Sequence, residues 1–149
     1  MAIGIGLTAY STRTEAIPTA SLNSIANGAN AIGTTAIDNT GALRQRYAEF
    51  DFYLASIDLS SQTSPAVYIW LLEQVDGTNY EDGSASVSPA RNPDLIIPLR
   101  TVNGAQRIHG ACSLKPGTFM ALIGNRSGVA LASSGNTLYY KKFSDEINN

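Results

Sequence analysis

From about residue 46 onward, apolar and polar residues alternate along this chain as they do in β-strands. Within residues 46–57, Phe50, Phe52 and Leu54 occupy every second position and therefore share one face of an extended segment. The residues between them, which share the opposite face, are Glu49, Asp51 and Tyr53. This period of two predicts a strand that is buried on one side only.

Other apolar segments also have the length of strands. Residues 66–75 are almost continuously apolar up to the turn signal Asp76–Gly77, which favours a more central strand. Residues 95–102 are expected to form an edge strand, because Pro98 has no N–H to donate. Asn103–Gly104 is a hairpin signal that leads into the next strand. The strands predicted after this turn are residues 106–112, 118–124 and 137–143.

The first 45 residues have a different composition. Glycines and Pro18 interrupt every apolar run, and Tyr10 is the only aromatic residue before Tyr47. A short helix is predicted over Ser21–Ala29, with Ser21 as its N-cap. Alanine, isoleucine and leucine recur throughout, so this segment is expected to become ordered against a surface. That surface is either a neighbouring subunit or the segment's own domain.

Together these patterns predict an all-β protein. Turn signals recur about every eight to twelve residues with no sustained helical period, which is typical of a β-sandwich or jelly roll. A chain of 149 residues is long enough to bury a core without disulfides or metal. We expect an extended N-terminal arm over residues 1–45 and one sandwich domain over residues 46–149. On this view, deleting residues 1–40 leaves a folded oligomer that no longer binds its partner.

The number and distribution of charged residues indicate which classes of partner to expect. Charged residues make up 15% of the chain, against about 25% in a typical domain, so a surface covered by other subunits is expected. The net charge is −2, and the largest basic group is the pair Lys141–Lys142, which argues against a nucleic-acid partner.

No run of about 18 apolar residues is present to span a membrane, and the N-terminus has no charged region of a secretory signal. Cys112 is the single cysteine, so no intrachain disulfide is possible and synthesis in a reducing cytoplasm is expected.

The sequence contains few candidates for catalytic residues. His109 is the only histidine, so it is the candidate base of a Ser-His-Asp or Cys-His site, with Cys112 or a serine as the nucleophile. His109 and Cys112 are three apart on a predicted strand, so their side chains should point to opposite faces. We therefore predict no catalytic residues, no cofactor and no small-molecule substrate. The segment Ile3–Leu7 is rich in glycine but lacks the Lys-Ser/Thr of a phosphate-binding loop.

Two further groups are candidates for ligand binding. The loop Asp76–Gly83 gathers three carboxylates and an amide, which are ligands that calcium prefers, but their spacing is not that of an EF-hand. A solvated loop whose aspartates bond their own backbone is the expected alternative, and no metal is predicted. Tyr80, Tyr139 and Tyr140 are possible stacking surfaces for sugars. Tyr139 and Tyr140 are adjacent in a strand, however, and cannot share a face.

Four segments of the chain resemble a known family. They are Val67–Leu72, Val75–Gly83, Lys115–Asn125 and Ser134–Tyr140, and the likeness closes on Ser144–Glu146. In these turn-and-strand patterns the chain resembles the small virion structural proteins of tailed bacteriophages, in particular the capsid decoration (cement) proteins. The likeness covers a little over half of the chain and does not include the N-terminal segment.

This resemblance implies a jelly-roll or β-sandwich subunit, as a homo-oligomer and most simply a trimer, on the capsid surface of the virion. It would be made in the host cytoplasm, bind the major capsid protein and have no enzymatic role. Two alternatives stay open. One is a tail or fibre protein that binds host glycan, and the other is a neck or tail-completion protein.

Overall fold

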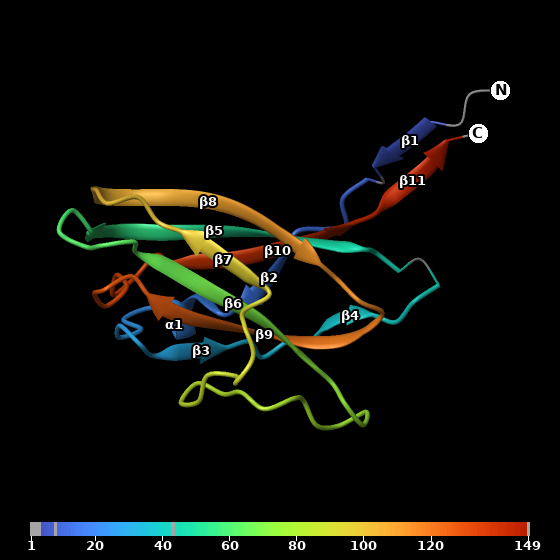
Figure 1. The fold of residues 1–149 in the computed structure, drawn as a ribbon, viewed down its shortest axis with the longest axis horizontal. Coiled ribbons are helices and arrows are strands. Elements are labelled where there is room, and N and C mark those ends of the chain that lie inside the picture. Colours follow the sequence, from blue (N-terminus) through green and yellow to red (C-terminus); the bar gives the residue numbers. More distant parts are fainter. Residues whose placement is uncertain (1–3, 8, 43, 149) are drawn as a thin grey trace.

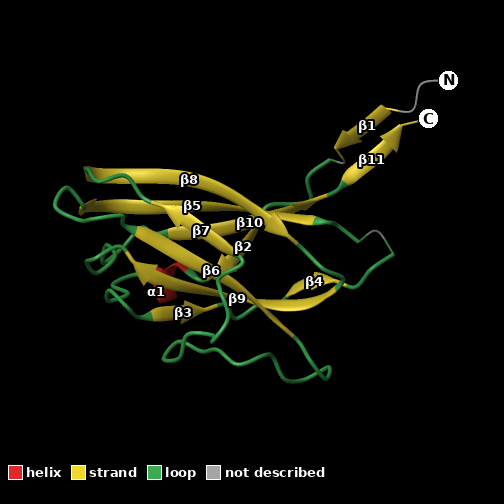
Figure 2. Cartoon of the chain, in the orientation of Figure 1, coloured by secondary structure: helices red, strands yellow, loops and turns green. Residues whose placement is uncertain are grey.

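The fold consists of β-strands and one short helix, as Figures 1 and 2 show. The structure is a computed structural model that describes residues 4–7, 9–42 and 44–148. The strands are β1 (Gly4–Leu7), β2 (Thr14–Ile17), β3 (Asn30–Ile32), β4 (Ile37–Asn39), β5 (Tyr47–Asp58), β6 (Ala66–Glu73), β7 (Leu95–Pro98), β8 (Asn103–Ser113), β9 (Gly117–Arg126), β10 (Thr137–Phe143) and β11 (Asp145–Asn148). The helix is α1 (Thr19–Leu22).

Two antiparallel sheets pack face to face as a β-sandwich (Figure 2). One sheet has the strand order β2–β10–β5–β8. The other has the order β3–β9–β6–β7, and β4 also pairs with β9. We call them the four-stranded and the five-stranded sheet. The chain changes sheet between β5 and β6 and again at each step from β7 to β10, so neighbouring strands are often distant in sequence. The predicted all-β sandwich is confirmed.

The long strands supply the core between the sheets. Phe50, Phe52 and Leu54 of β5 are fully buried, as their period of two predicts. Val67 and Ile69 of β6 meet them from the opposite sheet and are also fully buried. Burial of each such side chain stabilises the fold by about 1.5–3 kcal/mol.

Residues 14–39 belong to the sandwich, where the sequence predicts an extended arm. β2 pairs with β10 in one sheet, while β3 and β4 pair with β9 in the other. Ile17, Leu22 and Ile37 are fully buried. A glycine is needed at Gly33, because a Cβ there would lie 2.5 Å from the carbonyl oxygen of Ala16. Of the two surfaces left open for this segment, the structure selects its own domain, and strands from both sides of residue 45 share each sheet.

The predicted helix over Ser21–Ala29 is wrong. The helix that forms is a single turn, α1, and Ser24 adopts a positive φ of 58° two residues after its end. The Ser24 N–H then donates to the carbonyl of Ala132, and the carbonyl of Ile25 accepts from the N–H of Leu131. These tertiary hydrogen bonds hold residues 24–25 in a non-helical path that no local helical preference opposes strongly.

The hairpin predicted at Asn103–Gly104 is also wrong. The strand before it, β7, lies at the edge of the five-stranded sheet, as its proline predicts, but β8 belongs to the four-stranded sheet. Asn103 and Gly104 are the first residues of β8, and they pair with Asp58 and Ile57 of β5. The turn signal therefore marks a crossing between the sheets, which a local motif cannot distinguish from a hairpin.

The long loop between β6 and β7 covers the outer face of the five-stranded sheet. Trp70 and Leu72 of β6 and Leu122 of β9 form a second buried cluster there, and Tyr80 of the loop packs against it. The indole Nε1 of Trp70 donates to the carbonyl of Arg91, 3.2 Å away. Both faces of β6 are therefore buried, which is the physical reason for its nearly continuous apolar run.

The two ends of the described chain lie together. β1 pairs with β11 in a two-stranded ribbon that projects from one end of the sandwich (Figure 1). Over the described residues, no helix is long and apolar enough to cross a membrane.

Candidate functional site

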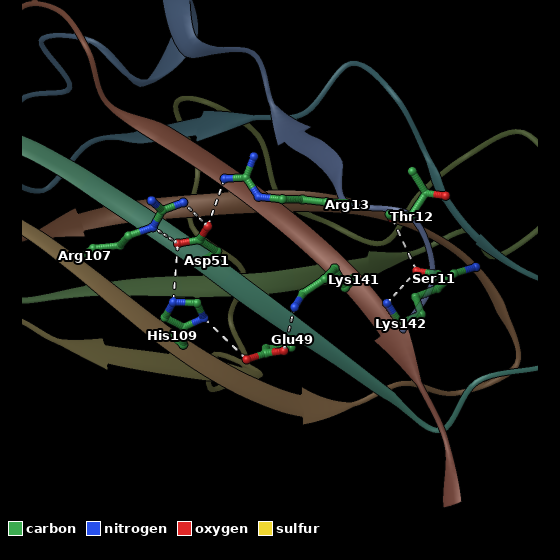
Figure 3. Close-up of polar contacts among 9 residues, drawn as sticks. All are labelled: Ser11, Thr12, Arg13, Glu49, Asp51, Arg107, His109, Lys141 and Lys142. Carbon is green, nitrogen blue, oxygen red and sulfur yellow. Dashed lines mark hydrogen bonds and ion pairs between the residues drawn. The ribbon is translucent and has the colours of Figure 1, made fainter. Parts of the chain in front are cut away.

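The outer face of the four-stranded sheet carries the largest group of interacting charged side chains that we find among the described residues. β5 contributes Glu49 and Asp51 from the positions between its buried phenylalanines. In the register, Glu49 lies opposite Lys141 of β10, and Asp51 lies opposite His109 of β8. We call the group the Asp51 cluster; it consists of Arg13, Glu49, Asp51, Arg107, His109 and Lys141. Figure 3 shows these side chains converging from three strands and the segment before β2.

Asp51 is the centre of this cluster and is only 5% exposed. Arg107 donates two hydrogen bonds to it, from Nε to Oδ1 at 2.9 Å and from Nη2 to Oδ2 at 2.6 Å. Arg13 donates a third, from Nη2 to Oδ2 at 2.9 Å. The hydrogen bonds from Arg107 lower the pKa of Asp51 to about 2, although burial acts in the opposite direction. Asp51 therefore stays ionised at neutral pH and holds both arginines in place.

Glu49 forms a second centre beside Asp51. His109 places Nδ1 at 3.4 Å from Glu49 Oε1 and Nε2 at 3.8 Å from Asp51 Oδ1. Lys141 Nζ lies 3.5 Å from Glu49 Oε2, an atom that is buried and accepts no hydrogen bond from the described residues. The imidazole thus lies between the two carboxylates, with one ring nitrogen facing each of them.

Aromatic rings continue this face beyond the charges. Phe143 of β10 packs against Tyr47 and Tyr10, with ring centroids 5.0 and 5.1 Å apart. Lys141 Nζ lies 4.0 Å from the centre of the Tyr10 ring, and Arg13 lies 3.5 Å from the centre of the Tyr139 ring. Each of these cations therefore bridges a carboxylate and an aromatic ring, which restricts its motion.

The segment before β2 is attached to this face by its backbone. Ser11 N–H donates to the carbonyl of Lys142, and the N–H of Lys142 donates to Ser11 Oγ, both at 2.8 Å. Ser11 Oγ also donates to the carbonyl of Thr12 (Figure 3). These bonds place Arg13 and Tyr10 over β10, so residues 10–13 complete the charged face.

His109 and Cys112 do not form a catalytic pair. His109 is exposed on the outer face, while Cys112 is half-buried and packs against the core from the inner side of β8. Their opposite directions are as the strand period predicts. Burial raises the pKa of the Cys112 thiol to about 12, so the thiol is not an activated nucleophile.

Asp76 and Glu81 of the Asp76–Gly83 loop bind separate partners. Asp76 accepts hydrogen bonds from the backbone of Thr78 and Asn79 and from the side chain of Asn79, and these bonds lower its pKa. Glu81 forms an ion pair with Arg91 at 2.5 Å. Over the described residues, no group of three or more histidine, cysteine, aspartate or glutamate side chains has the arrangement of a metal site.

The three tyrosines considered for sugar stacking lie in three environments. Tyr80 packs against the cluster under the β6–β7 loop, and Tyr140 is 8% exposed in the core. Tyr139 is on the outer face, but Arg13 lies over its ring. The two lysines of the predicted basic pair also have different partners. Lys141 forms an ion pair with Glu49, whereas Lys142 Nζ donates to the carbonyl of Asp38.

A groove of about 320 Å³ lies beside the end of β6. Arg91 Nη2 donates to the carbonyl of Leu71 at 2.8 Å, and Asp94 Oδ2 accepts from the N–H of Leu71 at 2.7 Å. Arg91 Nη1 and Asp94 also pair with each other at 2.8 Å. Arg91 and Asp94 therefore bond the backbone C=O and N–H of Leu71, where β6 extends past its pairing with β7. These two charged side chains have a structural role.

The sequence pattern alone does not predict the Asp51 cluster. The period of two places Glu49 and Asp51 on the outer face of a strand, but nothing in the pattern pairs them with Arg107 or Arg13. Arg107 occupies an alternate position of β8 and can be matched to Asp51 only when the register of β5 and β8 is known. Arg13 is 38 residues before Asp51 and lies outside any periodic segment.

No protein-family model matches this sequence, and no curated protein sequence matches it. Among solved structures, the chain is similar to the K1 cleaved adhesin domain of Lys-gingipain from Porphyromonas gingivalis W83, at 14% identity and a TM-score of 0.37. The match covers 80% of this chain and 62% of that one, so the chain spans less than two thirds of its length. A likeness at this level supports no conclusion about function.

Proposed function

We propose that this protein is a structural component of a tailed-bacteriophage particle, of the capsid decoration type. It binds the assembled head and stabilises contacts between major capsid protein subunits, and it acts as a homo-oligomer on the virion surface. The observation that carries the proposal is the outer face of the four-stranded sheet, where charged and aromatic side chains are held in fixed positions on a broad strand surface.

The two faces of the sandwich differ in a way that favours this face for binding. The outer side of the five-stranded sheet is covered by the β6–β7 loop, with Trp70 only 3% exposed beneath it. The outer side of the four-stranded sheet has no such cover among the described residues. Its exposed groups include Tyr10, which is 48% exposed, and the His109 and Arg107 side chains, which are 53% and 55% exposed.

Pre-organisation is the second argument. Asp51 and Glu49 hold the cations of the cluster before any partner arrives, so less side-chain entropy is lost when the partner binds. Decoration requires only binding. A protein that binds the assembled shell better than free subunits stabilises the shell by mass action, with no chemical step.

The proposal is tested on particles assembled without this protein. Purified protein is added to such heads, and binding is measured by co-sedimentation while shell stability is measured by thermal disruption. We expect saturable binding and a higher disruption temperature. Many copies on the head of a native particle would support the proposal, while a few copies at the tail or neck would overturn it.

Two variants of equal exposure locate the binding face. Tyr10→Ala removes a ring from the charged face, whereas Val87→Ala changes the β6–β7 loop; the two side chains are 48% and 49% exposed. We expect Tyr10→Ala to weaken binding to heads and Val87→Ala to leave it unchanged. Equal binding by both variants would exclude the charged face. Specific binding to a glycan array in place of heads would favour the tail or fibre alternative.

A further inference from the structure

β8 has an unpaired edge that another β-strand could bind. β8 is eleven residues long and lies at the end of the four-stranded sheet. It pairs with β5 along one side. In the part of the chain that the structure describes, no strand pairs with its other side, so its outward N–H and C=O groups form an unpaired row. Such a row is a template for another strand.

The other edges of the sandwich are protected by their length or by proline. β2 and β7 have four residues each, and β3 and β4 have three. β7 ends on Pro98, and Pro18 follows β2. Short strands and prolines are the usual protection against unwanted pairing. β8 has neither a proline nor a lysine, and its sequence includes Gly104, Ala105, Gly110 and Ala111. Small side chains of this kind permit close approach.

Apolar side chains line the same side of the sandwich. Ile108 and Cys112 point inward from β8, yet they are only partly buried, in contrast to the fully buried Phe50 and Phe52 of β5. Leu95 at the start of β7 is also partly buried and packs against Gly110. A strand added to β8 would cover this apolar opening as well as the free backbone groups.

We propose that the β8 edge binds the β8 edge of a second copy, antiparallel about a two-fold axis at Gly110. This register places Gly110 opposite its own equivalent on the axis. It also places His109 opposite the partner's Ala111, and Ile108 opposite the partner's Cys112. The two four-stranded sheets then become one continuous sheet across the dimer. The inference does not depend on the proposed function.

Self-complementarity selects this partner and this register. On the outer face, each large basic side chain meets a small one, because Arg107 lies opposite the partner's Ser113 and His109 opposite the partner's Ala111. On the inner face, Ile108 and Cys112 extend the apolar contact. A register centred on Ile108 would instead set Arg107 against the partner's His109, which places two basic groups together. A two-fold contact of identical patches is the commonest form of homo-oligomer.

The first test is the oligomeric state of the full chain by sedimentation velocity. We expect a dimer for the wild type and a monomer for Ala111→Lys, which sets a lysine against the partner's His109. Ala105→Lys is the matched control, because Ala105 is exposed on the same face of β8 but lies outside the paired stretch. We expect it to remain a dimer. A wild type that stays monomeric at its highest soluble concentration, or that forms a trimer, would overturn the proposal.

The second test measures the register and does not depend on a disruptive variant. A spin label is attached to cysteine at Ser113 or Ala105, with Cys112→Ser removing the native thiol. At about 3.3 Å per residue, the two-fold at Gly110 predicts backbone separations of about 20 Å between the two 113 positions and about 33 Å between the two 105 positions. Pulsed electron–electron double resonance measures the distance between the two labels. A shorter distance for label 113 than for label 105, by about the difference given, would support this register. Equal distances, or the reverse order, would exclude it.

Discussion

Arg107 and Asp51 form a diagonal ion pair across two neighbouring strands. In the register of β5 and β8, Asp51 lies opposite His109, and Arg107 lies opposite Tyr53. The guanidinium nevertheless reaches both carboxylate oxygens, at 2.9 and 2.6 Å. Diagonal neighbours on one face are about 7–8 Å apart, a distance that a long arginine side chain can span. A shift of one residue in this register would place the two side chains on opposite faces.

We expect Asp51→Asn to destabilise the fold by about 1–2 kcal/mol, because the change removes the charge that binds two arginines. The value lies toward the lower end for charged hydrogen bonds, since both arginines are partly exposed and water replaces part of the interaction. Urea unfolding followed by circular dichroism measures the loss. Asp58→Asn is the control, because Asp58 is exposed at the end of the same strand and, among the described residues, its side chain accepts hydrogen bonds from Ser60 alone. A similar loss in both variants would contradict a special role for Asp51.

The stabilisation by Asp51 should depend on pH in a defined window. The pKa of Asp51 is lowered from 3.8 to about 2 in the folded state, so the folded protein favours the ionised form. The contribution is therefore complete above the unfolded value of 3.8 and is lost as the pH falls toward 2. The difference in unfolding free energy between wild type and Asp51→Asn should shrink over this window. A difference that stays constant would show that the carboxylate is not titrating as described.

Deletion of residues 1–40 should unfold the protein. Ile17, Leu22 and Ile37 are fully buried, and β2 to β4 supply edge strands to both sheets, so this deletion removes part of the core. This is opposite to the outcome expected for an arm that binds only a partner. Circular dichroism and the loss of a cooperative thermal transition report the result.

A shorter deletion is the control for this experiment. Removing residues 1–8 takes away β1 and its pairing with β11 but leaves β2 and Arg13 in place. We expect the sandwich to keep a cooperative transition. If the deletion of residues 1–40 also unfolds cooperatively with little loss of stability, the packing of β2 to β4 is not essential to the fold.

Arg91→Ala should loosen the loop that covers the five-stranded sheet. Arg91 bonds Glu81, Asp94 and the carbonyl of Leu71, and its own carbonyl accepts from the Trp70 indole. Trp70 is the only tryptophan in the chain, so its fluorescence reports on this cover without labelling. We expect a red-shifted emission and faster proteolysis within residues 74–94.

The control for the loop is Arg100→Ala. Arg100 is exposed outside the loop, and the Gln106 side chain bonds its backbone, so the variant leaves these contacts in place. Its emission and proteolysis should match the wild type. Unchanged emission in Arg91→Ala would mean that the apolar contacts of Tyr80 and Leu72 hold the loop by themselves.

The sequence was most informative where a strand is long and its two faces differ. The alternation around Phe50 and Phe52 predicts β5 and its buried face correctly, and β10 has the bounds predicted for the strand over residues 137–143. Pro98 correctly marked β7 as an edge strand. In each case the information is local, because burial on one face imposes a period that single residues reveal.

The sequence was least informative where segments are short. β3 and β4 have three residues each, which is too few for a period to be recognised, and the glycines and Pro18 of the first 45 residues suggest an extended arm. The turn signal at Asn103–Gly104 is also uninformative about topology. A turn residue indicates a change of direction but does not indicate which sheet the chain enters. Only the packing of residues 14–39 against β9 and β10 decided their place.

The sequence by itself therefore determined the β class, the long strands and the residues that face outward on β5. Tertiary structure decided which strands are neighbours, and hence that Arg13 and Arg107 meet at Asp51. The physical reason is that strand pairing joins residues far apart in the chain, and its register is set by the shape of the whole core. The same tertiary arrangement left β8 with an unpaired edge, which no local pattern predicts.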